Sequence, residues 1–212
     1  MKKKIITLIL AAMMAVPTFA QYETSRMRSR YNHRNTEHYY GLRLGMNIAS
    51  ISCEDAELDL DSRTGLAFGG VYGFQLANNT PVWLETGLFY SEKGGKKKFG
   101  GEKVTTRLTY LQVPVVCKYS FDVYDDLYIQ PFLGGYLALG IAGKTKEYAT
   151  HETSSAYNTF NHFDGGLRIG CGAEYQMVYA EIGVDFGLAN ISKDDFNAAH
   201  NRSLFINVGV NF

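Results

Sequence analysis

The last nine residues of the chain alternate between two kinds of side chain. From Leu204 to Phe212, apolar residues fall at every second position, and small or polar residues mostly fill the gaps. Successive side chains of a strand point to opposite faces, so this segment predicts a strand with one apolar face. The same period recurs in seven further segments, 40–49, 65–76, 82–91, 111–119, 129–141, 164–175 and 178–188. Such a series, without amphipathic helices, is compatible with an antiparallel sandwich or a membrane barrel.

Three features favour the barrel over a soluble sandwich. The inner faces are rich in glycine and suit a narrow lumen. A secretory leader precedes the strands. Connections after the second, fourth and sixth segments are short, whereas the others have about 10 to 18 residues, and short turns at one rim with long loops at the other are typical of outer-membrane barrels. We therefore predict an all-β fold, an eight-stranded antiparallel up-and-down transmembrane β-barrel over 38–212, in the cell outer membrane.

The N-terminal region has the features of a targeting segment followed by a tail. Three lysines precede an apolar stretch from Ile5 to Val16, and Thr18-Phe19-Ala20 fits a cleavage site, so we predict a signal peptide over 1–20. Residues 21–37 are polar and basic, which predicts a flexible periplasmic tail. Lysine plus arginine and aspartate plus glutamate both total 21, so no global charge indicates nucleic acid as a partner.

The three cysteines, Cys53, Cys117 and Cys171, cannot all pair within one chain. We place Cys117 and Cys171 on the lipid face of the fourth and sixth segments, one strand apart, which is roughly 10 Å at ~4.8 Å per strand. A disulfide needs a Cα separation below about 7 Å, so free thiols are expected. No second ligand lies at a useful spacing from any cysteine, and we expect neither a metal site nor a cofactor.

Four stretches of the chain resemble the PorT-type outer-membrane barrel family of Bacteroidetes. They are Gly41 to Asn47, Leu84 to Gly94, Tyr110 to Pro114 with Lys118-Tyr119, and Phe163 to Leu167. The resemblance covers Tyr39 to Phe212 and implies an outer-membrane barrel. Some relatives are associated with protein secretion to the cell surface or with gliding, and the resemblance implies no catalytic residue. Where many relatives carry Glu in the Tyr-Leu-x-x-Pro strand, this chain has Gln112, which removes one interior carboxylate.

Every charge in the eight segments falls on the inner face, and we interpret these charges as a lumen network. They are Arg43, Glu85, Lys118, Asp164, Arg168, Glu174, Glu181 and Asp185. Because side chains just fill an eight-stranded barrel, a packed, salt-bridged interior is favoured over a pore. Five acids against three bases leave a carboxyl that is protonated, hydrated or near a rim. Extending the fourth segment puts Arg107 outward, which is tolerable only above the membrane boundary.

The long-loop rim offers candidate partner-binding residues. The second outer loop carries Lys96, Lys97, Lys98 and Phe99, and the third, Lys144 to Asn161, carries Tyr148, His151, Tyr157 and Phe160. Loops on a rigid scaffold commonly carry recognition, so we expect these to contact an envelope protein or glycan. Lys96 to Lys98 would contact anionic lipopolysaccharide, attract the acidic first loop, or simply be solvated.

No histidine lies at a spacing diagnostic of a nucleophile and its base, so the sequence does not predict an enzyme. The expected function is that of an integral outer-membrane barrel, in contact with outer-membrane lipid, with a structural or partner-binding role in the cell envelope. An association with secretion is implied only by the resemblance. The alternative is a barrel that transports small solutes or hydrophobic compounds. We expect a monomer.

Overall fold

The computed structural model describes residues 38–53, 60–76, 80–99, 102–124, 126–147, 153–156, 161–192 and 199–212. The chain divides into two units, Met1–Thr36 and Glu37–Phe212, and every described residue belongs to the second. The predicted signal peptide and basic tail therefore lie outside the described residues. Within the described part of the chain, no helix is both long and apolar enough to cross a membrane.

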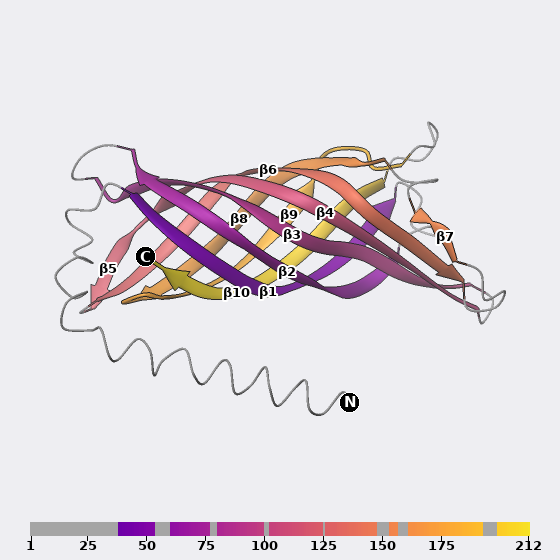
Figure 1. Ribbon diagram of the computed structural model, residues 1–212, viewed down its shortest axis with the longest axis horizontal. Coiled ribbons are helices and arrows are strands. Elements are labelled where there is room, and N and C mark those ends of the chain that lie inside the picture. Colours follow the sequence, from indigo (N-terminus) through magenta and orange to yellow (C-terminus); the bar gives the residue numbers. More distant parts are fainter. Residues whose placement is uncertain are drawn as a thin grey trace, which may run out of the picture. The chain divides into compact units, whose positions relative to one another are not determined.

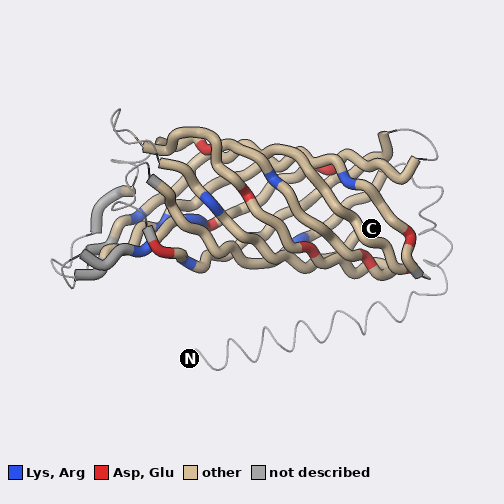
Figure 2. The backbone as a smooth tube through the Cα atoms, turned by 180° about the vertical axis from the view of Figure 1, so that it is seen from behind, with Lys and Arg blue, Asp and Glu red and all other residues tan. Residues whose placement is uncertain are grey.

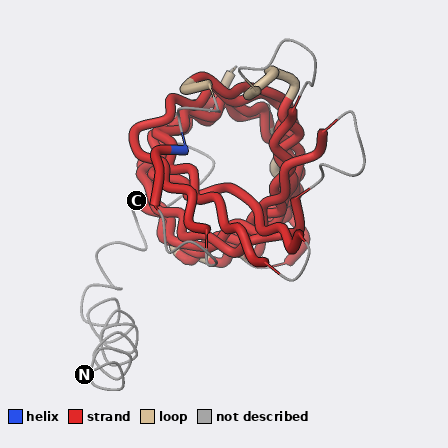
Figure 3. The backbone as a smooth tube through the Cα atoms, turned by 90° about the vertical axis from the view of Figure 1, so that its right-hand side faces the viewer, coloured by secondary structure: helices blue, strands red, loops and turns tan. Residues whose placement is uncertain are grey.

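Eight long strands form a closed ring, seen from the side in Figure 1 and along its length in Figure 3. They are β1 (His38–Cys53), β2 (Leu60–Gln75), β3 (Val82–Phe99), β4 (Glu102–Tyr119), β6 (Leu127–Glu147), β8 (Phe163–Tyr175), β9 (Val178–Gly187) and β10 (Ala199–Asn211). Every pairing is antiparallel; β1 pairs with β10, and β4 with β6. The short strands β5 (Phe121–Tyr124) and β7 (Thr153–Ser155) add to β6. The eight-stranded antiparallel barrel is confirmed.

The two faces of the barrel follow the predicted alternation. On β1, Leu42, Leu44 and Met46 are exposed, while Arg43 and Asn47 on the opposite face are buried. An apolar outer face and a polar inner face are the arrangement that a lipid-embedded barrel requires. Acidic and basic positions are distributed along the length of the wall in Figure 2.

Aromatic side chains gather on the outer face near both ends of the barrel. The rings of Phe68 and Tyr90 stack with centroids 4.9 Å apart toward the long-loop end. Tyr119 and Phe121 have centroids 4.4 Å apart at the short-turn end. Aromatic rings at both ends of the outer face are typical of the interfacial girdles of a transmembrane barrel.

The second outer loop was predicted wrongly. Lys96 to Phe99 belong to β3, β4 begins at Glu102, and only residues 100–101 connect the two strands. Three consecutive lysines and two glycines hide the alternation here, whereas backbone hydrogen bonds hold a hairpin whatever its side chains are. Likewise Lys144–Glu147 continue β6. The other proposed loop residues, Tyr148, His151, Tyr157 and Phe160, lie outside the described residues.

Candidate functional site

A carboxylate on β3 anchors the charge network nearest the short turns. Glu85 Oε2 accepts hydrogen bonds from Lys118 Nζ at 2.8 Å and from the Tyr39 hydroxyl at 2.5 Å. Arg43 Nη2 lies 3.7 Å from the same oxygen. Lys118 Nζ also donates to the Tyr179 hydroxyl at 2.7 Å, and the Arg43 guanidinium lies 4.0 Å from the centre of the Tyr179 ring. These contacts join β1, β3, β4 and β9 through the lumen.

Two further carboxylates of the lumen are held by side-chain amides. Glu174 Oε2 accepts from Gln130 Nε2 at 3.0 Å and from Asn211 Nδ2 at 2.9 Å. Glu181 Oε1 accepts from Asn207 Nδ2 at 2.7 Å. Amide donors thus provide hydrogen bonds to acids for which the lumen has too few bases.

A second network lies toward the long-loop end. Asp185 accepts hydrogen bonds from Arg168 Nε at 2.6 Å and Nη2 at 2.9 Å, and from Gln112 Nε2 at 2.9 Å. Lys93 Nζ lies 3.3 Å from Asp164 Oδ2 and 3.8 Å from Asp185 Oδ2. One ammonium therefore bridges two buried carboxylates, which neutralises charge that would otherwise be costly to bury.

Apolar side chains separate the networks and close the long-loop end. Val116, Phe132 and Phe205 form one cluster, and Arg168 lies over the Phe205 ring at 4.1 Å. The end cluster comprises Ile51, Leu108, Tyr110, Tyr136, Ala138, Ala156, Ile191 and Ala199. Buried apolar clusters and buried charge networks therefore both line the lumen.

The structure places all eight proposed lumen residues inside the barrel and buries them. Six of them make ion pairs, and Glu174 and Glu181 accept hydrogen bonds from side-chain amides. The sequence interpretation missed Lys93, whose side chain is fully buried. Continuing the period of two from Phe89 through Ser91 would have placed it inside.

A second charged cluster lies on the outer face at the long-loop end. Glu92 Oε2 accepts from Arg107 Nη2 at 2.9 Å and lies 3.7 Å from Arg63 Nη2, while the Tyr90 hydroxyl donates to Glu92 Oε1 at 3.1 Å. The Arg107 side chain is 52% exposed. Burial lowers the pKa of the Arg63 guanidinium, and the nearby Arg107 charge acts in the same direction. The outward arginine thus has a carboxylate partner, which the sequence interpretation did not assign.

The remaining proposed residues divide by what the structure describes. Lys96 pairs in register with Asp61 on β2 and Thr105 on β4, and Lys97, Lys98 and Phe99 complete β3. Cys117 and Cys171 are free and exposed on β4 and β8, with β6 between them, as predicted. Among the described residues, no group of three or more His, Cys, Asp or Glu side chains could hold a metal ion.

Several solved structures are similar to this chain. The attachment invasion locus protein Ail of Yersinia pestis is 13% identical over 84% of this chain and 100% of its own, with a TM-score of 0.48. Neisserial surface protein A is 18% identical over 84% of this chain and 98% of its own, with a TM-score of 0.46. OprG of Pseudomonas aeruginosa is 12% identical over 82% of this chain and 95% of its own, with a TM-score of 0.47. No curated protein matches the chain.

The family comparison covers most of the sequence. The model of the outer membrane protein beta-barrel domain matches residues 16–193, a stretch that contains both charge networks and seven of the eight barrel strands. A closed antiparallel barrel with an apolar exterior agrees with that match. The chain therefore belongs to the outer membrane protein beta-barrel family and is an integral protein of the outer membrane.

Proposed function

We propose that this barrel is a closed, non-catalytic anchor that presents its long-loop end to a partner in the cell envelope and does not conduct solutes. The observation that carries the proposal is the pair of buried ion networks spanning the lumen at two levels. Lys118 connects Glu85 on β3 to Tyr179 on β9, and Lys93 on β3 reaches Asp164 on β8. The Lys118–Tyr179 and Lys93–Asp164 contacts join strands that are not neighbours in the ring, whereas Lys118 and Glu85 lie on the paired strands β4 and β3.

A solute path through the lumen would have to break these contacts. Eight strands enclose a space that side chains just fill, so a continuous aqueous path requires networked side chains to move aside. Removing one partner of a buried ion pair leaves an uncompensated charge, which opposes such opening. The alternative, transport of small solutes or hydrophobic compounds, therefore requires both networks to rearrange.

The partner would meet a rigid surface at the long-loop end. The β3–β4 hairpin stays paired from Glu92 and Thr109 to Phe99 and Glu102, past the last exposed large apolar residue of each strand. A paired hairpin holds Lys96 to Phe99 in a fixed arrangement, which lowers the entropy lost on binding. The PorT resemblance supports a partner from a secretion assembly at the cell surface, and an envelope glycan is the other candidate class.

Planar-bilayer recordings of the purified folded barrel test the closed lumen. We expect no discrete openings from the wild type, because both networks stay intact. Stepwise openings whose size changes in Glu85→Gln or Arg168→Gln, and does not change in the exposed control Arg202→Gln, would establish the transport alternative instead.

Photo-cross-linking in intact cells tests the partner surface. A photoreactive residue at Lys96 is expected to give a discrete adduct, whereas the same residue at Arg202, also at the long-loop end but on β10, is expected to give none. Replacing 148–160 by a Gly/Ser linker should weaken the adduct and leave heat-modifiable gel migration unchanged. Equal adduct patterns at the two positions would contradict the proposal.

A further inference from the structure

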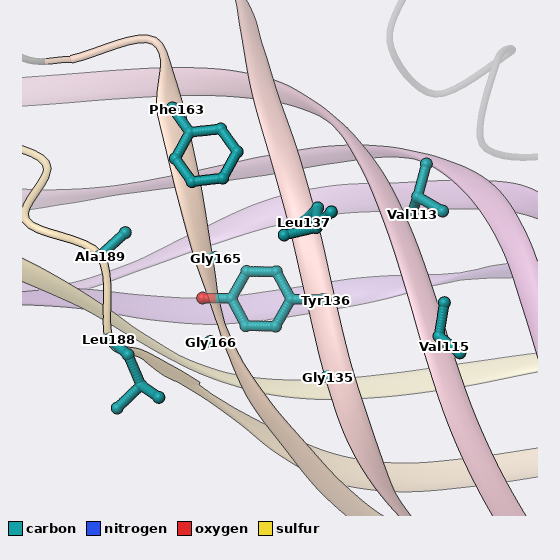
Figure 4. A pocket seen from close by; sticks show the side chains of 10 residues that line it. All are labelled: Val113, Val115, Gly135, Tyr136, Leu137, Phe163, Gly165, Gly166, Leu188 and Ala189. Carbon is teal, nitrogen blue, oxygen red and sulfur yellow. The ribbon is translucent and has the colours of Figure 1, made fainter.

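A groove of about 440 Å³ runs along the outer face where β4, β6 and β8 lie side by side (Figure 4). Side chains of Val113, Val115, Leu137, Phe163 and Leu188 line it, and all five are outward-facing and apolar. The groove therefore opens to the lipid side of the barrel wall and offers contacts to hydrocarbon.

The groove exists because outward positions on two adjacent strands lack side chains. Gly135 and Gly165 take outward places on β6 and β8, where neighbouring outward positions carry leucine or phenylalanine. Neither glycine has a left-handed backbone conformation, so the course of the chain does not demand glycine there. A Cβ atom would lie 3.2 Å from the nearest atom at Gly135 and 3.3 Å at Gly165, so small shifts would admit one. The space is kept open without a backbone requirement.

An excess of positive charge lies on β4 and β6, two of the three strands that line the groove, at the long-loop end. The register sets Arg107 of β4 directly opposite Lys144 of β6, and both side chains are exposed. Like charges directly opposite in a sheet repel each other. Glu92 is the acid at this cluster and is shared by Arg107 and Arg63. Among the described residues, Lys144 has no acidic partner in an ion pair, so an anion placed between the strands would relieve the repulsion.

The distance between the charges and the groove matches an amphiphile. Lys144 follows Ile141, an exposed apolar residue of β6, so the basic pair lies at the edge of the apolar band. Leu137 is seven residues before Lys144, which is about 23 Å along the strand. At a tilt of 35–45° this is about 17 Å along the bilayer normal, close to the ~15 Å thickness of one hydrocarbon leaflet. An acyl chain whose headgroup is at Arg107 and Lys144 would reach the groove.

We propose that the outer face of β4 and β6 binds a phosphorylated, multiply acylated glycolipid of the outer leaflet, the lipid A part of lipopolysaccharide. Its phosphate binds Arg107 and Lys144, and one acyl chain fills the groove at Gly135 and Gly165. The long-loop end of such barrels faces the outside, which selects the outer leaflet. This site does not depend on whether the lumen is closed or on a protein partner.

Native mass spectrometry of the folded barrel in detergent, with diphosphoryl lipid A or phosphatidylglycerol added, tests the site. Wild type should retain lipid A, and Arg107→Gln with Lys144→Gln should weaken its binding about thirtyfold, since each basic residue near a membrane surface contributes roughly fivefold. The charge-conserving pair Arg107→Lys with Lys144→Arg should retain it. Arg202→Gln, at the same end on β10, is the matched control. Heat-modifiable gel migration verifies that each variant is folded.

A second pair of variants tests the groove itself. Gly165→Val should weaken lipid A binding several-fold, because its side chain occupies the space of the acyl chain. Gly70→Val is the control, since Gly70 also faces outward and a Cβ there would lie 3.8 Å from its nearest neighbour. No retention of lipid A by wild type, equal loss in the Arg202 control, no difference between the two glycine variants, or equally tight phosphatidylglycerol binding would each overturn the proposal.

Discussion

Strand β3 carries two carboxylates seven residues apart, Glu85 and Glu92, and the barrel surrounds them with nearly the same groups. Glu85 binds Lys118 of β4 at 2.8 Å, and Glu92 binds Arg107 of β4 at 2.9 Å. Each carboxylate also lies 3.7 Å from a second base, which is Arg43 for Glu85 and Arg63 for Glu92. Each also accepts a hydrogen bond from a tyrosine hydroxyl. The two carboxylates are similarly buried, with side chains 6% and 10% exposed, and the difference lies in the base of β4, because the side chain of Lys118 is 1% exposed and that of Arg107 is 52% exposed.

Because the two β4 bases differ in exposure, the same arrangement of a carboxylate, two bases and a tyrosine has a different physical role at each end of β3. Inside the lumen, Glu85 and its bases are shielded from water, so each charge depends on its partners for neutralisation. On the outer face, the Arg107 guanidinium keeps donors that remain accessible, and solvent screens its pair with Glu92. A carboxylate with two bases therefore stabilises the barrel at one end of β3 and leaves a basic group available for a ligand at the other.

Removing an inner base should have the largest effect. Lys93→Met leaves Asp164 without a cation and removes one from Asp185, so we expect a loss of about 3–5 kcal/mol in the free energy of unfolding. The urea midpoint of the folded barrel in lipid vesicles, followed by gel migration, measures it. Arg63→Met, which removes the more distant base of the outer cluster, should cost less, because Glu92 keeps Arg107 at 2.9 Å. Equal losses would contradict the assignment of roles.

Alanine substitutions of glycines on the two faces should differ by a smaller amount in the free energy of unfolding. A side chain at Gly45, which faces the lumen, would overlap the Ile206 carbonyl oxygen and the Asn207 side chain, so Gly45→Ala should cost about 1–3 kcal/mol. A Cβ at Gly70, on the outer face, would make only an ordinary van der Waals contact at 3.8 Å, so Gly70→Ala should stay within about 0.5 kcal/mol of wild type. The same urea series compares them, and a neutral Gly45→Ala would mean that the lumen is loosely packed.

The smallest effect on stability is expected from the outer arginine. Arg107→Gln should change the free energy of unfolding by about 0–1 kcal/mol, because the Arg107 side chain is half exposed. A loss above about 2 kcal/mol in the urea series would show that the outer cluster stabilises the barrel as the inner network does.

Much of the fold could be predicted from the sequence because a barrel repeats one rule. The period of two assigned the inner and outer residues of β1, β8 and β10 correctly, since lipid outside and a narrow lumen inside impose opposite demands on neighbouring positions. That rule also located the eight proposed lumen charges. It failed at Lys93 and Lys96–Phe99, where lysine and glycine resemble a loop although backbone pairing continues.

The specific contacts of the site were not predictable from the pattern. Which base binds Glu85 depends on the strand register and on contacts between strands that are not neighbours, as from Lys118 to Tyr179. The groove depends on Gly135 and Gly165 lying on adjacent strands, and the opposition of Arg107 and Lys144 depends on an irregularity in the register between Thr109 and Tyr110. The alternation of residues along a single strand predicts neither the adjacency of the two glycines nor the opposition of the two basic residues.

Two double-mutant cycles on β3 test the central claim most directly. One combines Glu85→Gln with Lys118→Met, and the other combines Glu92→Gln with Arg107→Met, each followed by urea unfolding in the same lipid vesicles. We expect a coupling free energy of about 2–3 kcal/mol for the inner pair and below about 1 kcal/mol for the outer pair. Equal couplings, or a larger coupling for the outer pair, would contradict the claim that the inner pair stabilises the barrel whereas the outer pair leaves Arg107 available to bind a ligand.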